Sequence, residues 1–124
     1  DIVDFQDYTS ENPAVDSGEL DLNEFQHLLY LATYNAKNKQ NLVPIGATAV
    51  YPLPLYSTKH KSVSEIPQGG QVAIPNDPTN GGRALLILQS AGLITLKDGG
   101  NITSTVQDVV KNDKNLRCYK PLHN

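Results

Sequence analysis

The stretch best suited to binding a ligand covers residues 72–88, where a short apolar strand leads through a polar loop into a helix. A loop that opens a helix presents backbone N–H groups and the positive end of the helix dipole to an anion. Arg83, in the first turns of the expected helix, adds a planar guanidinium that matches a carboxylate or a phosphate. The alternative interpretation is that Arg83 is solvated and that nearby polar residues only cap the helix. These residues are Asn76, Thr79 and Asn80.

A second candidate group lies at Phe25, His27 and Tyr30, near the start of another expected helix. Two aromatic rings with one polar imidazole suit an apolar side chain of a ligand. The alternative is that Phe25 and Tyr30 are core residues and that His27 is a satisfied group at the surface or at a helix end. Tyr51 and Tyr56, on an extended segment, carry the same ambiguity.

Signals for catalysis or for a bound metal are weak. The sequence has no Gly-x-Ser-x-Gly elbow, no His-Glu-x-x-His helix, and neither the Walker A nor the GxGxxG glycine pattern. Cys118, the single cysteine, has no context of a nucleophile, and with three scattered histidines it makes no zinc-spaced cluster. A formal net charge of −3 argues against nucleic acid as a partner. The sequence therefore predicts a protein that is not an enzyme and that needs no metal or cofactor.

The elements that must position these residues follow from apolar spacing and from turn signals. Apolar residues recur at helical spacing over residues 23–37 and 80–91, which predicts two long helices. Apolar stretches are too short to span a bilayer, and the absence of an apolar leader leads us to expect that any signal segment has been removed. The alternation of strands and helices predicts the α/β class. The other expected elements are strands over 1–5, 71–75, 93–96 and 116–119, short helical turns over 12–18 and 62–66, a proline-punctuated extended segment over 42–57, and a helix over 105–111.

Several groups of residues occur in an order that is specific to one protein family. They are residues 23–27 (NEFQH), 43–46 (VPIG), 51–52 (YP), 72–80 (VAIPNDPTN) with Gly82 and Arg83, and 86–99. In this order they resemble the methionine-binding lipoprotein family of the NlpA/MetQ type, the solute-binding components of methionine ABC importers. The resemblance covers nearly the whole chain.

The resemblance implies an α/β fold like that of type II periplasmic binding proteins, in which an amino acid sits in the cleft between two lobes. The chain covers about half of the family's length, so it would hold incomplete parts of both lobes joined by a crossover segment. Residues 1–49 would belong to lobe one, residues 50–57 to the crossover segment, and residues 58–124 to lobe two.

The resemblance also assigns roles to the candidate residues. Arg83 would hold the ligand carboxylate, and Asn76 and Asn80 would supply further polar contacts. The resemblance also implies that aromatic and imidazole groups surround the thioether side chain, which agrees with the favourable contact of sulfur with aromatic rings. These groups are Phe25, His27, Tyr30 and Tyr51.

The implied function is the capture of methionine or a related amino acid for an ABC importer. The implied partners are that amino acid and the transporter permease, and the implied location is extracytoplasmic, in a membrane-anchored lipoprotein whose anchor lies outside this sequence. A second interpretation is a shortened relative with a structural or surface-interaction role and no transport function. Unpaired sheet edges further predict a complementary fragment of the parent chain or a strand-exchanged oligomer.

Overall fold

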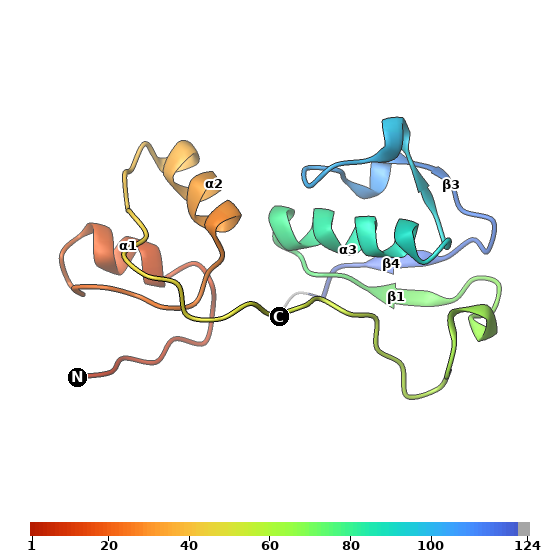
Figure 1. Ribbon diagram of the computed structural model, residues 1–124, viewed down its shortest axis with the longest axis horizontal. Helices are drawn as coiled ribbons and strands as arrows, with labels where there is room; N and C mark the ends of the chain where they lie inside the picture. The colour runs from red at the N-terminus through yellow and green to blue at the C-terminus, as the bar shows by residue number, and fades with distance from the viewer. Residues whose placement is uncertain (122–124) are drawn as a thin grey trace. The chain divides into compact units, whose positions relative to one another are not determined.

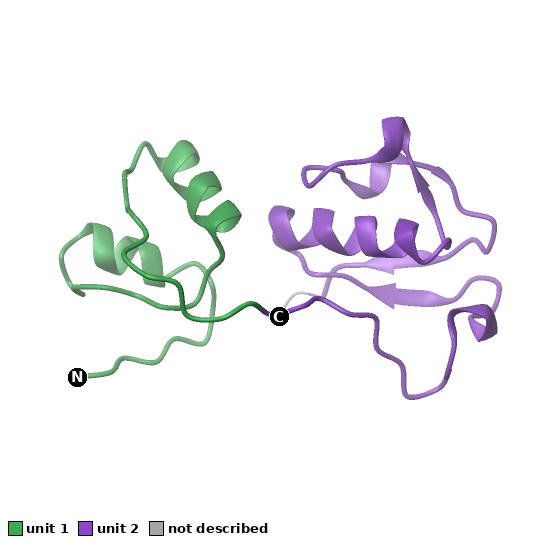
Figure 2. Cartoon of the chain, in the orientation of Figure 1, with its two compact units in different colours: residues 1–50 green, residues 51–124 purple. Residues whose placement is uncertain are grey.

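The computed structural model describes residues 1–121, and the chain divides into two compact units, residues 1–50 and 51–124 (Figure 1, Figure 2). Unit 1 contains the helices α1 (Glu11–Asp16) and α2 (Leu28–Asn38), joined by irregular chain. Unit 2 contains one long helix, short 3₁₀ turns and four short strands. In chain order these are η1 (Val63–Glu65), β1 (Gln71–Ala73), α3 (Pro78–Ser90), β2 (Thr95–Leu96), η2 (Lys97–Gly99), η3 (Val106–Asp108), β3 (Val109–Lys111) and β4 (Arg117–Tyr119).

The long helix of unit 1, α2, begins directly after His27, which caps it. The Nδ1 atom of His27 accepts a hydrogen bond from the backbone N–H of Tyr30 at 3.0 Å, and Lys39 ends the helix in the left-handed conformation with φ 54°. The sequence predicts this helix over residues 23–37, and that start is wrong. The residues before His27 are not helical, because carboxamides in that segment bond to α1.

The short helix α1 confirms the helical turn expected over residues 12–18, with Gly18 following it at φ 80°. A hydrogen bond from the Tyr34 hydroxyl to the Asp16 carboxylate ties α2 to α1. The carboxylate favours the protonated hydroxyl, which raises the pKa of Tyr34 to about 12. The two helices of unit 1 are therefore connected by a side-chain hydrogen bond.

The strand expected over residues 1–5 is wrong. These residues form no strand, and the side chains of Ile2 and Val3 are 99% and 54% exposed. A strand needs a partner for its backbone groups, and within its described residues unit 1 has no other strand to supply one. Alternation of apolar and polar residues is therefore not sufficient here.

The core of unit 2 forms around α3, which runs alongside the β1–β4 strand pair (Figure 1). Leu85, Leu88 and Leu96 are each 1% exposed, and burial of a leucine contributes about 1.5–3 kcal/mol. Asp77 caps the helix and Pro78 occupies its first position, so the helix starts two residues before the expected Asn80. No helix within residues 1–121 has both the length and the apolar character to cross a membrane. The buried apolar residues are Ile74, Leu85, Leu88, Leu93, Ile94, Leu96 and Leu116.

The strands of unit 2 form two separate pairs. β1 and β4 are parallel, with Val72 opposite Cys118, and the pairing continues where the N–H of Ile74 donates to the carbonyl of Tyr119 at 3.0 Å. β2 and β3 are antiparallel, with Leu96 opposite Val109. Three of the expected strands are thus confirmed within 71–75, 93–96 and 116–119, each shorter than expected.

One helix expected in unit 2 is wrong. Residues 105–111 form the turn η3 followed by the strand β3 instead of one helix, because β-branched valines favour the pairing with β2. The turn expected over residues 62–66 is confirmed as η1, and the Glu65 carboxylate accepts from the N–H of Lys61. Residues 42–57 form neither helix nor strand, as their prolines predict.

Candidate functional site

In unit 1 four rings lie together, and we call Tyr8, Phe25, His27 and Tyr30 the aromatic group. The ring of Phe25 meets Tyr30 edge to face, with centroids 5.8 Å apart, and stacks on Tyr8 at 6.2 Å. The rings of His27 and Tyr30 are perpendicular at 6.4 Å. The structure therefore brings together the three residues predicted from the sequence in this unit.

Tyr8 is the member that sequence reasoning missed. The Tyr30 hydroxyl donates to the backbone carbonyl of Tyr8 at 2.6 Å, across 22 residues of sequence. No periodic spacing connects positions that far apart, so the sequence does not predict that Tyr8 joins the other rings. Near Tyr8 the sequence carries only the signal of a turn. That turn is built by Asp7, whose carboxylate accepts from the N–H groups of Thr9 at 2.6 Å and of Ser10 at 2.8 Å. Hydrogen bonds from the side chains and backbone of Thr9 and Ser10 lower the pKa of Asp7 to about 2.

In unit 2 the start of α3 carries three connected polar residues, Asp77, Asn80 and Arg83, which we call the Arg83 group. The Asp77 carboxylate accepts from the Asn80 backbone N–H at 2.9 Å and from its side-chain amide at 3.3 Å. The Asn80 carbonyl oxygen in turn accepts from Nη1 of Arg83 at 2.9 Å. The carboxylate thus orients an amide, and the amide orients a half-buried guanidinium.

The capping arrangement corrects one part of the alternative interpretation, the residues expected to cap this helix. Asp77 is the cap, and not Asn76, Thr79 or Asn80; the Thr79 hydroxyl itself donates to Asp77 at 2.9 Å. Pro78 has no N–H, so the helix end offers an anion fewer donors than the sequence predicts. The guanidinium of Arg83 becomes the main cationic feature of the group. An aspartate directly before a proline at the first helical position is a sequence signal that could have identified Asp77.

Gly81 and Gly82, the two residues before Arg83, lie inside α3. A Cβ atom at Gly82 would lie 2.1 Å from the carbonyl oxygen of Ile102, and one at Gly81 would lie 3.2 Å from that of Pro75. The glycines let the helix approach neighbouring backbone closely. The position of Arg83 therefore depends on this close approach.

Two further predicted residues are Asn76 and Tyr51. Asn76 donates from its side-chain amide to the carbonyl of Pro121 at 3.2 Å. Tyr51 is 77% exposed on the extended segment that opens unit 2.

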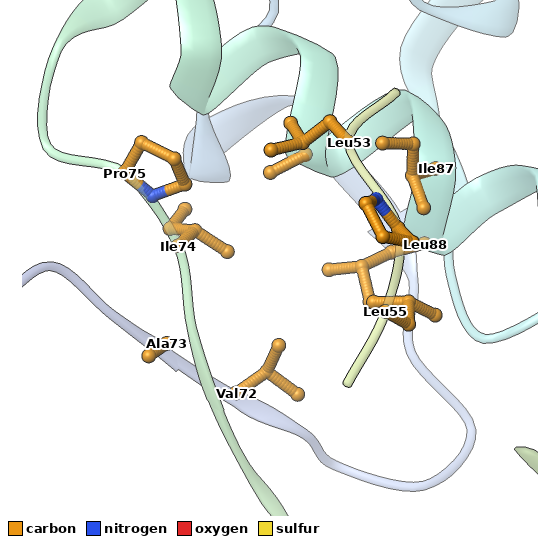
Figure 3. Close-up of a pocket in the computed structure, with 10 residues that line it drawn as sticks. Leu53, Leu55, Val72, Ala73, Ile74, Pro75, Ile87 and Leu88 are labelled. Carbon is orange, nitrogen blue, oxygen red and sulfur yellow. The ribbon is translucent and has the colours of Figure 1, made fainter. Parts of the chain in front are cut away.

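An apolar pocket of about 90 Å³ lies in unit 2 between α3, β1 and the extended segment (Figure 3). Leu53 and Leu55 face it from the extended segment, and Ile87 and Leu88 from α3. Its lining includes none of the predicted site residues and no polar side chain, so it has no group to hold a carboxylate. Within residues 1–121 no three His, Cys, Asp or Glu side chains lie close enough together to hold a metal ion.

Comparison with known proteins assigns the chain to a family. The family model described as NlpA lipoprotein matches residues 1–121. The chain belongs to the NlpA lipoprotein family. This family member is 53% identical over 115 residues to the probable D-methionine-binding lipoprotein MetQ of Haemophilus influenzae, across 92% of this chain and 42% of that relative. It is 50% identical over 119 residues to the D-methionine-binding lipoprotein MetQ of Escherichia coli K12, across 96% of this chain and 44% of the relative.

Solved structures that align with this chain share its fold over the matched region. The methionine binding protein MetQ aligns with a TM-score of 0.90 at 50% identity, across 96% of this chain and 49% of that one. A nutrient binding protein from Burkholderia cenocepacia, solved bound to methionine, aligns with a TM-score of 0.92 at 41% identity, across 98% and 52%. The α/β fold like that of type II periplasmic binding proteins is confirmed. The chain spans about half the length of the relatives it matches.

Proposed function

We propose that this chain is part of a solute-binding protein that captures methionine or a related amino acid for an ABC importer. The observation that carries the proposal is the alignment with the Burkholderia cenocepacia protein, which was solved with methionine bound and matches 98% of this chain. The relatives from Haemophilus influenzae and Escherichia coli are named as D-methionine-binding lipoproteins and support the same ligand class.

In this proposal the Arg83 group takes the ligand carboxylate. A guanidinium offers two parallel N–H donors to a carboxylate, and the bond to Asn80 holds it in one orientation. Because Asn80 is neutral, it orients Arg83 without neutralising its charge. Asn76 and Asn80 supply the further polar contacts to the amino acid.

The aromatic group takes the thioether side chain of methionine. Sulfur in contact with aromatic rings is favourable by about 0.3–1.5 kcal/mol per contact. Phe25 and Tyr30 already meet edge to face, so their geometry needs little ordering when a ligand arrives. Tyr51, now 77% exposed, would be covered by the ligand, and His27 adds a polar group beside the rings.

The proposal extends to lobes, partners and location. The division into compact units at residues 50 and 51 supports residues 1–49 as part of lobe one, 50–57 as the crossover segment and 58–124 as part of lobe two. The relatives' names as binding lipoproteins support a permease partner, an extracytoplasmic membrane-anchored location and the absence of enzymatic activity. The described strands of unit 2 form only two-stranded sheets, which are weakly stable alone. This supports the proposal that further strands complete these sheets, supplied by a complementary part of the parent chain or by strand exchange with a second copy.

A chimera tests the proposal, in which this chain replaces the matched segment of Escherichia coli MetQ. Titration calorimetry with methionine is expected to show binding, and Arg83→Ala is expected to cost about 3 kcal/mol, since it leaves a ligand charge without its partner. Arg117→Ala is the matched control, because Arg117 is exposed on β4. Unchanged affinity in a folded Arg83→Ala chimera, or tighter binding of glutamate or lysine than of methionine, would contradict the assignment.

A further inference from the structure

Three carboxamides in unit 1, which we call the amide cluster, connect α1 to the segment that carries Phe25 and His27. Asn12 and Gln26 bond head to head: Nδ2 of Asn12 donates to Oε1 of Gln26 at 2.9 Å, and Nε2 of Gln26 donates to Oδ1 of Asn12 at 2.7 Å. Asn23 adds a bond from its Nδ2 to the same Oδ1 of Asn12 at 3.0 Å. Each of the two paired carboxamides, Asn12 and Gln26, therefore both donates to and accepts from the other.

Asn12 is the most deeply buried polar side chain of this cluster. It is 2% exposed, and the other fully buried large side chains are all leucines. A buried carboxamide is costly unless it is hydrogen-bonded, so the arrangement that satisfies it is strongly favoured over others. A fully satisfied buried polar network fixes one geometry, whereas an apolar contact tolerates several.

Gln26, the partner of Asn12, lies between Phe25 and His27 in the sequence. We propose that Asn12 is a positioning residue for the aromatic group: it fixes the side chain of Gln26, and thereby the backbone that carries the two flanking rings. This inference rests on the proposed function, because the rings it positions are those assigned to the methionine side chain. None of the three carboxamides needs to touch the ligand.

The variant Asn12→Asp tests the inference, because it keeps the size of the side chain and removes its donor. A carboxylate oxygen then faces Oε1 of Gln26, and the head-to-head pair cannot form. Asn35→Asp is the matched control. The side chain of Asn35 also donates and accepts: its Nδ2 donates to the carbonyl of Leu42 at 2.8 Å, and its Oδ1 accepts from the N–H of Leu42 at 3.1 Å. Asn35 lies in the last turns of α2.

The first measurement uses the 124-residue chain and nuclear Overhauser contacts between the ring protons of Phe25 and Tyr30. We expect Asn12→Asp to lose most of this intensity at a temperature where it is as folded as Asn35→Asp, and the control to keep it. Gln26→Glu breaks the same pair from the half-buried side and is expected to give the same signature. It carries the test should Asn12→Asp not fold. Unmoved ring contacts in either folded variant would overturn the inference.

The second measurement uses the chimera with Escherichia coli MetQ and titration with methionine. We expect about a tenfold loss of affinity in Asn12→Asp and no change in Asn35→Asp, a difference equivalent to about 1.4 kcal/mol. Equal affinities in the two variants would contradict the positioning role. A chimera that binds no methionine even without substitutions, while the ring contacts respond as expected, would reject the proposed function and leave the positioning of the rings standing.

Discussion

The two groups of candidate binding residues are held in place mainly by different kinds of polar group. In unit 2 a carboxylate does so, since Asp77 orients Asn80 and Asn80 orients Arg83. In unit 1 the segment that carries Phe25 and Tyr30 is held without a carboxylate, because Nδ1 of His27 caps α2 and the carboxamide of Asn12 anchors the preceding segment. A carboxylate, that of Asp7, builds only the turn next to Tyr8. A site for an anion tolerates a fixed charge nearby provided an amide separates it from the guanidinium. A site for an uncharged thioether is better built from neutral groups, which create no competing field.

The largest expected effect comes from Gly82→Ala, which should damage unit 2 and leave unit 1 intact. The added Cβ meets backbone, the carbonyl oxygen of Ile102 at 2.1 Å, and backbone cannot move aside as a side chain can. We expect a loss of about 2–3 kcal/mol in the free energy of unfolding, measured with denaturant. Gly46→Ala is the control, because a Cβ there would meet nothing within 4 Å. Similar losses in both variants would show that the close approach of α3 is unimportant.

An intermediate effect is expected from removing the two helix caps, which compares the charged cap with the neutral one directly. Asp77→Ala should cost about 1–2 kcal/mol, because it removes both the hydrogen bond and the favourable charge at the helix dipole. His27→Ala should cost about 0.5–1 kcal/mol. Thermal unfolding in low and high salt checks the difference, since salt screens only the charged contribution. Losses that respond equally to salt would remove the contrast between the units.

The smallest effect concerns acid and the turn that holds Tyr8. The fold lowers the pKa of Asp7 from 3.8 to about 2, so its stabilisation is present above pH 4 and is lost as the pH falls towards 2. We expect the amide resonances of Thr9 and Ser10 to shift over this range, with a change in the environment of Tyr8. Asp7→Asn serves as the control, and persistence of the same transition in that variant would assign it to another group.

Local patterns predict the two long helices of this chain well and their exact starts poorly. The periodic leucines of α3 mark a helix in any context, because one apolar face must be buried. The start of α2 is misplaced because Asn23 and Gln26 bond to Asn12 across 11 and 14 residues, a contact that no local pattern contains. The strand expected over residues 1–5 fails for the related reason that a strand is defined by its partner.

The residues of the candidate site likewise divide into those that local sequence patterns predict and those that depend on distant contacts. Phe25, His27 and Tyr30 are close in sequence, and their grouping in unit 1 follows from one helix start. Asp77 could have been predicted from its place before a proline, because capping is a local property. Tyr8 could not, since its contact with Tyr30 spans 22 residues and depends on how α1 packs.

Cys118, the chain's single thiol, lies in the β1–β4 pair and can therefore serve as a chemical probe of how often and how fast these two strands separate. It lies opposite Val72 and is partly buried, and burial raises the pKa of its thiol. Because only an exposed thiolate attacks a disulfide reagent, labelling proceeds mainly while the two strands are apart. With dilute reagent the labelling rate follows the fraction of molecules that are open, and with concentrated reagent it approaches the opening rate itself. One unmodified chain thus yields both the equilibrium and the kinetics of the strand pair alongside which α3 runs.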